Sequence, residues 1–158
     1  MYSPSSVAAL FTNIANEQGK QLTHMQLQKL TYIAHGFKLA TTAGQSGLIT
    51  DNVNAWKFGP VIPSLYHALK SWGNGYIPSL YVSENIEPGD TGIVRAVYNT
   101  YGALDGVSLS DLTHRNETPW DQIWNGRNGR EQSGAVIPNE LISQYYTDYL
   151  SRGAANGL

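Results

Sequence analysis

The sequence predicts a mainly α fold: a single-domain helical bundle, residues 1–158, with a small β-hairpin or short-strand element. In several segments the apolar residues recur every three or four positions, between a capping residue or proline at the start and a glycine at the end. The 158 residues include 41% apolar and 14% charged side chains, as in a globular chain that buries about 70% of its unfolded surface. One short stretch, around Trp56 and Phe58, has the alternation of a strand.

The first predicted helix runs from Pro4 to Gln18. Ser3 is its expected cap, Pro4 suits the first helical position, and Gly19 suits a left-handed stop. Its apolar stripe consists of Val7, Leu10, Phe11 and Ile14.

The second helix is expected between a capping box, formed by Thr23 and Gln26, and a stop at Gly44. Gly36 lies inside this helix and weakens it by about 1 kcal/mol relative to alanine. We therefore expect another backbone to approach closely at Gly36. The core face consists of Leu27, Leu30, Ala34 and Phe37, and Met25 and Ile33 widen it.

The segment 54–70 is the most informative part of the chain. Trp56 and Phe58 are expected on one face of a short extended run. A Gly59-Pro60 turn then acts as a rigid hinge, and a third helix is expected from Pro63 to Trp72, because the residue before a proline avoids helical angles. The segment contains no acid–base pair, phosphate loop or metal spacing, so it favours recognition over catalysis.

The second half of the chain predicts shorter elements. In residues 73–90 the β-friendly Tyr76–Ile77 and Leu80–Val82 predict a small sheet or flap shared with the Trp56 segment. The predicted helices are Thr91–Tyr101 capped by Asp90, Ser108–His114 capped by Ser108, a short helix after Thr118 that ends before Gly126, and Pro138 to about Arg152.

The end of the chain carries three further expectations. On the last helix, Tyr145 and Tyr149 are expected in the core and Tyr146 at the surface. Residues 126–134 are expected to form a mobile loop, and residues 153–158 a frayed tail.

Composition excludes several classes of protein. The chain has no cysteine, so disulfide and thiolate chemistry are excluded and a cytoplasmic, non-secreted protein is expected. No apolar run approaches the roughly 20 residues of a membrane span. The first residues have neither the basic region nor the apolar core of a signal peptide.

Charge is distributed unevenly along the chain. All five lysines lie in the first half and all five arginines in the second, with net charges of +3 up to residue 80 (five lysines, two acids) and −5 after it (five arginines, ten acids). Either two lobes of one domain attract each other, or a basic face is presented to an acidic partner. The pI of 6.0 disfavours nucleic acid as the partner.

Three segments together resemble one family. They read Leu-Gln-Lys-Leu-Thr-Tyr (27–32), Ala-Trp-Lys-Phe-Gly-Pro-Val (55–61) and Leu-Ser-Asp-Leu-Thr-His-Arg-Asn-Glu-Thr-Pro-Trp (109–120). Their order and spacing are similar to those of the Panacea-domain proteins, the SocA-like antitoxins, which include phage-associated proteins of the GepA type. The resemblance covers about residues 7–125, and the predicted helix 138–152 lies beyond it.

This resemblance implies a bacterial or phage-borne antitoxin that neutralises a cognate protein toxin by direct stoichiometric binding, with no cofactor, metal or membrane. Members of the family accompany many unrelated toxins, so the chemistry of the toxin does not follow. The candidate partner-binding residues are Lys29, Tyr32, Trp56, Lys57, Phe58, Gly59, Pro60, His114, Pro119 and Trp120.

Some of these residues also have a purely structural interpretation. Trp56 and Phe58 either pack on the second helix as core or form an exposed anchor for a partner. Lys29 is either a solvated or snorkelling side chain or a charge held near the Trp56 segment for a carboxylate of the partner.

His114, Glu117 and Asp121 form a compact titratable group. A general base oriented by a carboxylate is one interpretation. The motif offers only Thr113 and Thr118 as nucleophiles, so a buried tie from His114 to the backbone or to a carboxylate is favoured. The histidines also lack the His-x-x-x-His spacing of a helical metal site. Neither catalytic nor metal-binding residues are therefore predicted.

Two other functions stay open. One is a phage-encoded interaction protein that inhibits a host protein or acts as an adaptor for a host protease. The expected frayed tail, residues 153–158, is the feature that suggests an adaptor. The other is a small hydrolase that uses His114 and Glu117. A homodimer is compatible with the sequence.

Overall fold

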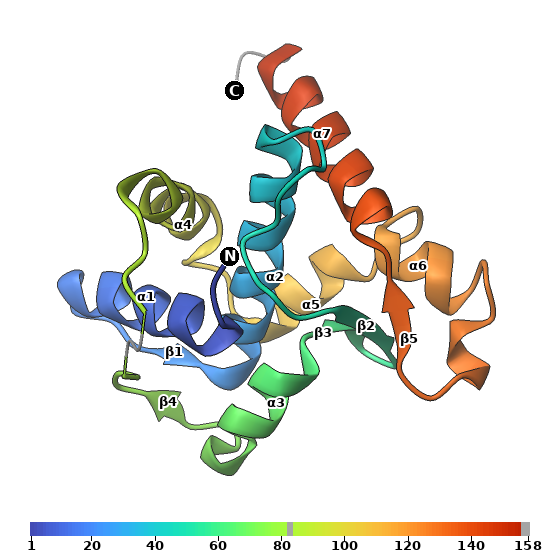
Figure 1. The fold of residues 1–158 in the computed structure, drawn as a ribbon. Coiled ribbons are helices and arrows are strands. Elements are labelled where there is room, and N and C mark those ends of the chain that lie inside the picture. The colour runs from blue at the N-terminus through green and yellow to red at the C-terminus, as the bar shows by residue number, and fades with distance from the viewer. Residues whose placement is uncertain (82–83, 156–158) are drawn as a thin grey trace.

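A central helix, α2 (His24–Thr41), organises the computed structural model, which describes residues 1–81 and 84–155 (Figure 1). Every residue from Leu27 to Gly36 is buried, as in a helix surrounded on all sides. Helices α1, α4, α5 and α7 pack against it. The other helices are α1 (Pro4–Glu17), α3 (Pro63–Leu69), α4 (Pro88–Tyr101), α5 (Gly106–Thr113), α6 (Pro119–Trp124) and α7 (Asn139–Ala155), with 3₁₀ turns η1 (Lys70–Trp72) and η2 (Gly129–Glu131).

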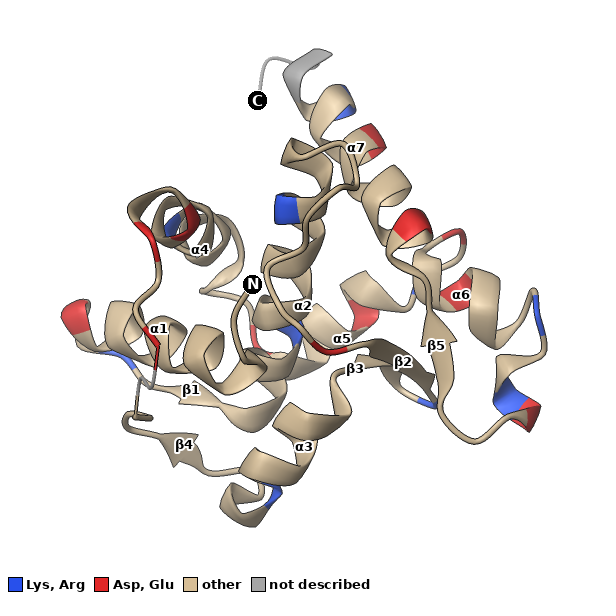
Figure 2. Ribbon diagram, viewed as in Figure 1, with Lys and Arg blue, Asp and Glu red and all other residues tan. Residues whose placement is uncertain are grey.

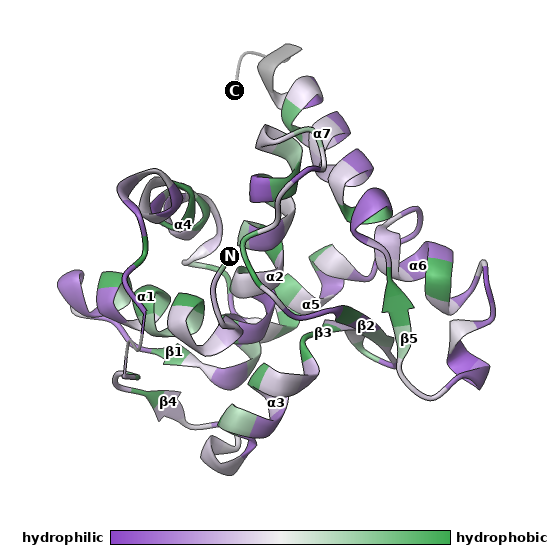
Figure 3. Ribbon diagram, in the orientation of Figure 1, coloured by the Kyte–Doolittle hydropathy of each residue, from purple (hydrophilic) through white to green (hydrophobic). Residues whose placement is uncertain are grey.

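Two small antiparallel sheets complete the fold, so the predicted mainly α class with short strands is confirmed. A three-stranded sheet has the order β3-β2-β5, and a two-stranded sheet pairs β1 with β4. Figure 3 shows hydrophobic residues on β5 and hydrophilic ones around η2. The strands are β1 (Leu22–Thr23), β2 (Val53–Trp56), β3 (Gly59–Val61), β4 (Tyr76–Ile77) and β5 (Ala135–Ile137).

The predicted caps of α1, α2 and α6 and the predicted start of α3 are confirmed. Ser3 accepts a hydrogen bond from the Ser6 N–H, and Thr23 and Gln26 form the complete capping box. Helix α3 begins at Pro63, and the Thr118 side chain accepts from the Asp121 N–H at the start of α6. These signals are local, so the sequence is sufficient to locate them.

The predicted partner of the Trp56 strand is wrong. Strand β4, from the 73–90 segment, pairs with β1 through Leu22 and Ile77, whereas β2 pairs with β3 and with β5. The predicted extended stretch ending at Val82 runs into residues 82–83, which lie outside the described residues. Pairing between distant segments depends on how the helices bring them together, which no local signal reports.

Gly59 and Pro60 do not form the predicted hinge. The chain turns at Lys57 and Phe58, and Gly59 and Pro60 belong to β3, opposite Trp56 and Ala55. Strand β3 lies at the edge of the sheet, where a proline without an N–H is tolerated. Gly59 has a φ of +124°, which side-chain-bearing residues rarely adopt.

Two predicted caps in the second half are also wrong. Helix α4 starts at Pro88 after Glu87, so Asp90 lies in its first turn and not before it. Helix α5 starts at Gly106, and Asp105 caps it by accepting from the Ser108 N–H. In each case the helix begins two or three residues earlier than the apolar stripe indicates.

Asp90 instead forms a buried network with groups from the first half of the chain. Its carboxylate pairs with the Lys38 ammonium at 2.6 Å and accepts from the Tyr2 hydroxyl at 2.7 Å. Burial opposes ionisation, but these two hydrogen bonds hold the pKa of Asp90 below its usual value. A second ion pair joins Glu17 to Arg95. The Lys38–Asp90 pair agrees with the interpretation that the positive and negative halves attract each other, whereas the Glu17–Arg95 pair joins an acid of the positive half to an arginine of the negative half. Figure 2 shows the charges spread over many elements.

The tyrosine face of α7 is rotated from the predicted one. Tyr146 is 5% exposed, Tyr145 is half-buried and Tyr149 is 39% exposed, so the expectation for this helix is wrong. The contact of α7 with α2 determines its buried side, and Tyr146 lies against Gly36 there. A side chain, not a backbone, thus approaches Gly36. Helix α7 extends to Ala155, and residues 156–158 of the predicted tail lie outside the described residues.

In the described ranges 1–81 and 84–155, no helix combines the length and the apolar character needed to cross a membrane.

Gly36→Ala is expected to destabilise the protein by about 1–3 kcal/mol, because its methyl group would lie 2.2 Å from Cδ2 of Tyr146. This overpacking outweighs the gain in helix propensity of about 1 kcal/mol. The matched control is Gly92→Ala on the exposed side of α4, where no atom lies within 4 Å and a gain of about 0.4–1 kcal/mol is expected. Urea denaturation measures both, and a Gly36→Ala protein as stable as the wild type would contradict the packing.

Candidate functional site

A groove of about 500 Å³ lies beside the N-terminal half of α2. Its walls come from the first turns of α2, the β2–β3 hairpin, α3, the turn at Gly73 and the start of α5. The segments 27–32 and 55–61 of the sequence resemblance both contribute to it, through Gln28 and Lys29 and through the hairpin.

The hairpin is anchored to the third segment of the resemblance. The Trp120 indole N–H on α6 donates to the Trp56 carbonyl at 2.6 Å, and the Ser110 hydroxyl on α5 donates to the Phe58 carbonyl at 2.7 Å. The two ends of the turn are therefore held by buried or partly buried side chains of α5 and α6. The three segments of the resemblance meet at this hairpin.

Gln28 binds the other end of the hairpin to α2. Its side-chain oxygen accepts from the Ile62 N–H at 2.8 Å, and its amide nitrogen donates to the Ile62 carbonyl at 3.1 Å. This two-point contact positions the start of α3, which contributes Tyr66 to the groove. Gln28 was not among the predicted site residues, although a polar side chain between the apolar Leu27 and Leu30 was the signal that could have identified it.

Lys29 is the buried cation of the site. Its side chain is not solvated or snorkelling, so that expectation is wrong: the residue is 4% exposed, and its Nζ donates to the Pro60 carbonyl at 2.7 Å. The ion pairs formed by the described residues do not include Lys29. Burial without a counter-charge lowers the pKa of Lys29 to about 7. The other interpretation, a charge near the Trp56 segment, matches this position.

His24 is a second polar residue of the groove with unsatisfied hydrogen-bonding capacity. Its Nε2 is buried and has no hydrogen-bond partner in the described part of the chain, and its ring lies 5.3 Å from that of Tyr66. Burial, and to a smaller extent the positive charge of Lys29, lower the pKa of His24. Its exposed neighbour Met25 also lines the groove, so the expectation that Met25 widens the core face is wrong.

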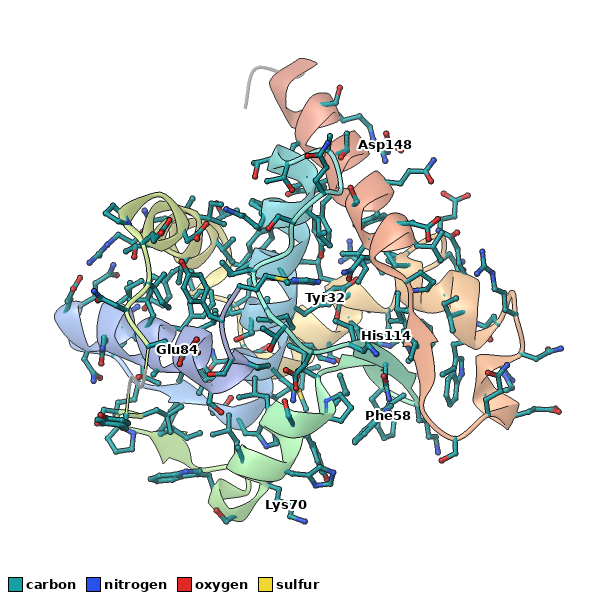
Figure 4. All side chains as sticks on the ribbon, viewed as in Figure 1. Tyr32, Phe58, Lys70, Glu84, His114 and Asp148 are labelled. Carbon is teal, nitrogen blue, oxygen red and sulfur yellow. The ribbon has the colours of Figure 1, made fainter. Side chains whose placement is uncertain are left out.

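Large apolar side chains surround the groove at the protein surface. Val107 is 74% exposed, Phe58 69%, Met25 44% and Tyr66 36%. Trp56 is half-buried, with its ring 5.0 Å from that of Tyr66. Trp56 and Phe58 do not share an extended face as predicted, because β2 ends at Trp56 and Phe58 lies in the turn, labelled in Figure 4. We call these five residues the apolar rim.

The remaining candidate residues lie in different environments. Lys57 is exposed, with its Nζ 5.4 Å from the centre of the Phe58 ring. Gly59 and Pro60 are buried in β3, and Pro119 and Trp120 are buried in α6. Tyr32 is 1% exposed and packs edge-on against Tyr146, so it belongs to the core between α2 and α7.

His114 ends helix α5 and is engaged by the backbone. Its Nδ1 donates to the Ser110 carbonyl, and its ring packs edge-on against Trp120. The Asp121 carboxylate accepts from the Glu117 backbone N–H at 2.9 Å. This arrangement agrees with the backbone tie favoured for His114. In the described residues, no three His, Cys, Asp or Glu side chains are grouped as a metal site.

The comparison with protein families identifies the class of protein. Residues 27–121, which include α2 from Leu27 onward, the hairpin and the first three residues of α6, match the model of the family described as Antitoxin SocA-like, Panacea domain, and the chain belongs to this family. Among individual proteins, the chain is 31% identical to the Antitoxin SocA of Caulobacter vibrioides (strain NA1000 / CB15N) over 153 aligned residues. The alignment covers 89% of this chain and 80% of that relative. No solved structure gives a significant match.

The lowered pKa of Lys29 predicts a specific dependence of stability on pH. Because the folded lysine loses its proton near pH 7 and the unfolded one near 10.5, the unfolded state binds more protons between these values, and stability rises with pH there. The slope is about 1.4 kcal/mol per pH unit. In Lys29→Met this rise between pH 7.5 and 9.5 should be absent, as measured by urea denaturation. Parallel pH profiles for the two proteins would contradict the burial of the ammonium.

Proposed function

We propose that this protein is an antitoxin that neutralises a cognate protein toxin by direct, stoichiometric binding. Membership of the SocA-like Panacea-domain family supports this role, as does the similarity to a protein named Antitoxin SocA. In our proposal the antitoxin covers the functional site of the toxin, in the cytoplasm of a bacterium or during phage infection.

The observation that carries the proposal is the apolar rim. Aromatic residues and methionine are enriched at protein–protein interfaces and at their energetic hot spots. Here Phe58, Val107 and Met25 line the same groove and expose apolar surface, whereas the apolar side chains of the core are buried. The hairpin that presents Phe58 is held by Trp120 and Ser110. A rim held in place before binding loses less conformational entropy when a partner docks.

The proposed mechanism is occlusion without catalysis by the antitoxin itself. The alternative general base, His114, donates its Nδ1 proton to the Ser110 carbonyl and packs against Trp120. The Asp121 carboxylate accepts from the Glu117 backbone N–H. The His114 ring is therefore engaged by the backbone and by Trp120, which supports binding over hydrolysis as the function.

The test uses the protein encoded beside this gene as the toxin. The toxin expressed alone should inhibit growth, and co-expression of the antitoxin should restore it. The two proteins should also co-purify in a fixed ratio. The failure of both rescue and co-purification would overturn the proposed function. Rescue by a protein that never forms a complex would overturn the direct mechanism.

Phe58→Ala is expected to weaken binding of the toxin by about 10- to 100-fold, as for an aromatic hot spot. The matched control is Tyr81→Ala, which removes an aromatic side chain that is 87% exposed and does not line the groove. Both variants should retain the melting temperature of the wild type, since both side chains lie at the surface. Calorimetric titration measures the affinities, and equal affinities for the two variants would exclude the rim as the binding surface.

A further inference from the structure

On the basis of the proposed function, we propose that the groove binds a linear, apolar segment of the toxin that carries a side-chain carboxylate. This carboxylate pairs with the ammonium of Lys29, while the apolar residues on either side of it contact the rim. Lys29 is then the residue that selects an acidic segment, and Phe58, Met25 and Val107 supply the apolar contact.

The first argument is the unmet hydrogen-bonding capacity of Lys29. An ammonium has three N–H donors, and the Pro60 carbonyl accepts only one of them. A buried charge is costly unless it is paired, and replacement of the lost water by one carbonyl does not pair it. Since Lys29 lines the groove, an anion that enters there is its available counter-charge.

The second argument is the charge of the groove itself. Its charged and titratable side chains are Lys29 and His24 from α2, Lys57 and Tyr66 from the hairpin and α3, and Asp105 before α5. The carboxylate of Asp105 already accepts from the Ser108 N–H as the cap of α5. The buried Nε2 of His24 has no partner among the described residues and can hydrogen-bond the same ligand. The balance of charge therefore favours an anion.

The third argument concerns which anion fits. The groove of about 500 Å³ lies within the range of roughly 300–1,000 Å³ typical of ligand sites. Its apolar walls extend onto an exposed rim, which a single small anion would leave uncovered. Chain termini are commonly captured by backbone N–H groups, but Asp105 occupies the start of α5. A side chain with a methylene stem reaches a buried ammonium, so the inferred ligand is Asp or Glu within an apolar segment.

Gly59 keeps the hairpin close to this cation. A Cβ at Gly59 would lie 2.9 Å from Nζ of Lys29 and 3.6 Å from Cβ of His114. The absence of a side chain lets β3 pass directly over Lys29 with its Pro60 carbonyl aimed at the ammonium. The glycine of the Gly-Pro-Val motif is therefore explained by its close approach to Lys29, the proposed binding residue.

Proton uptake should accompany binding. In the unbound protein, burial lowers the pKa of Lys29 to about 7. A bound carboxylate would raise this pKa again. Affinity should therefore fall as pH increases above 7, by up to about tenfold per unit. The titratable groups nearest Lys29 are His24 on α2, whose pKa is lowered mainly by burial, and His114 behind Gly59.

The probes are overlapping peptides of about 15 residues that cover the neighbouring gene's protein, a length suited to an extended or helical segment in a groove. Peptides that bind the full-length wild-type protein are remade with each Asp or Glu replaced by Asn or Gln. One replacement should weaken binding by about tenfold or more. Lys29→Met should show the same loss for the acidic peptide and no further loss for the amide peptide. The control, Lys70→Met, removes an exposed lysine outside the groove, labelled in Figure 4.

Several outcomes would overturn this inference while the proposed function stands. These are a toxin that binds although none of its peptides does, a peptide whose carboxylates can all be replaced without loss, and equal losses for Lys29→Met and Lys70→Met. The peptide replacements are measured with the wild-type protein only. They therefore test the need for a carboxylate even if the Lys29→Met variant does not fold. If the antitoxin neither binds the full-length toxin nor restores growth, the proposed function fails, and with it this inference.

Discussion

The burial of α2 on all sides is the constraint on which the rest of the structure depends. A helix surrounded by other elements cannot send its buried polar side chains to water, and three of those on α2 bond instead to the backbone of neighbouring segments. Gln28 binds Ile62, Lys29 binds Pro60, and His35 accepts from the N–H groups of Leu48 and Ile49. The central helix therefore positions the loops and short strands around it through its own polar residues.

The same constraint produces the groove. Contacts from Gln28 and Lys29 hold the edge strand β3 close to the helix, and Ser110 and Trp120 hold the turn from the opposite side. The hairpin is fixed at both ends, and its apolar turn residue, Phe58, stays at the surface. One consequence is a lysine without a counter-ion beneath an apolar rim. A core lysine is costly for stability, so the proposed role in partner binding would account for its presence better than packing does.

Sequence signals located the caps of α1, α2 and α6 and missed the strand partners and helix faces that distant contacts determine. The capping box at Thr23, the proline at position 63 and the Thr118 cap each act within one helical turn, so they were predictable. The third strand of the sheet was not, because Ala135–Ile137 reaches β2 only after α6 has turned the chain back. The face of α7 was missed for a similar reason: Gly36 on α2 admits Tyr146, and nothing within α7 reports this.

By itself the sequence determined the mainly α class, most helix boundaries and the segments that identify the family, because hydrophobic periodicity, caps and motif spacing are properties of the chain. Only the tertiary structure decided which motif residues are buried and which are available to a partner. Tyr32 and Lys29 stand three positions apart on one helix, yet one packs against α7 and the other lies under the hairpin. The physical reason is that burial depends on the elements that surround a residue, and those elements come from distant parts of the chain.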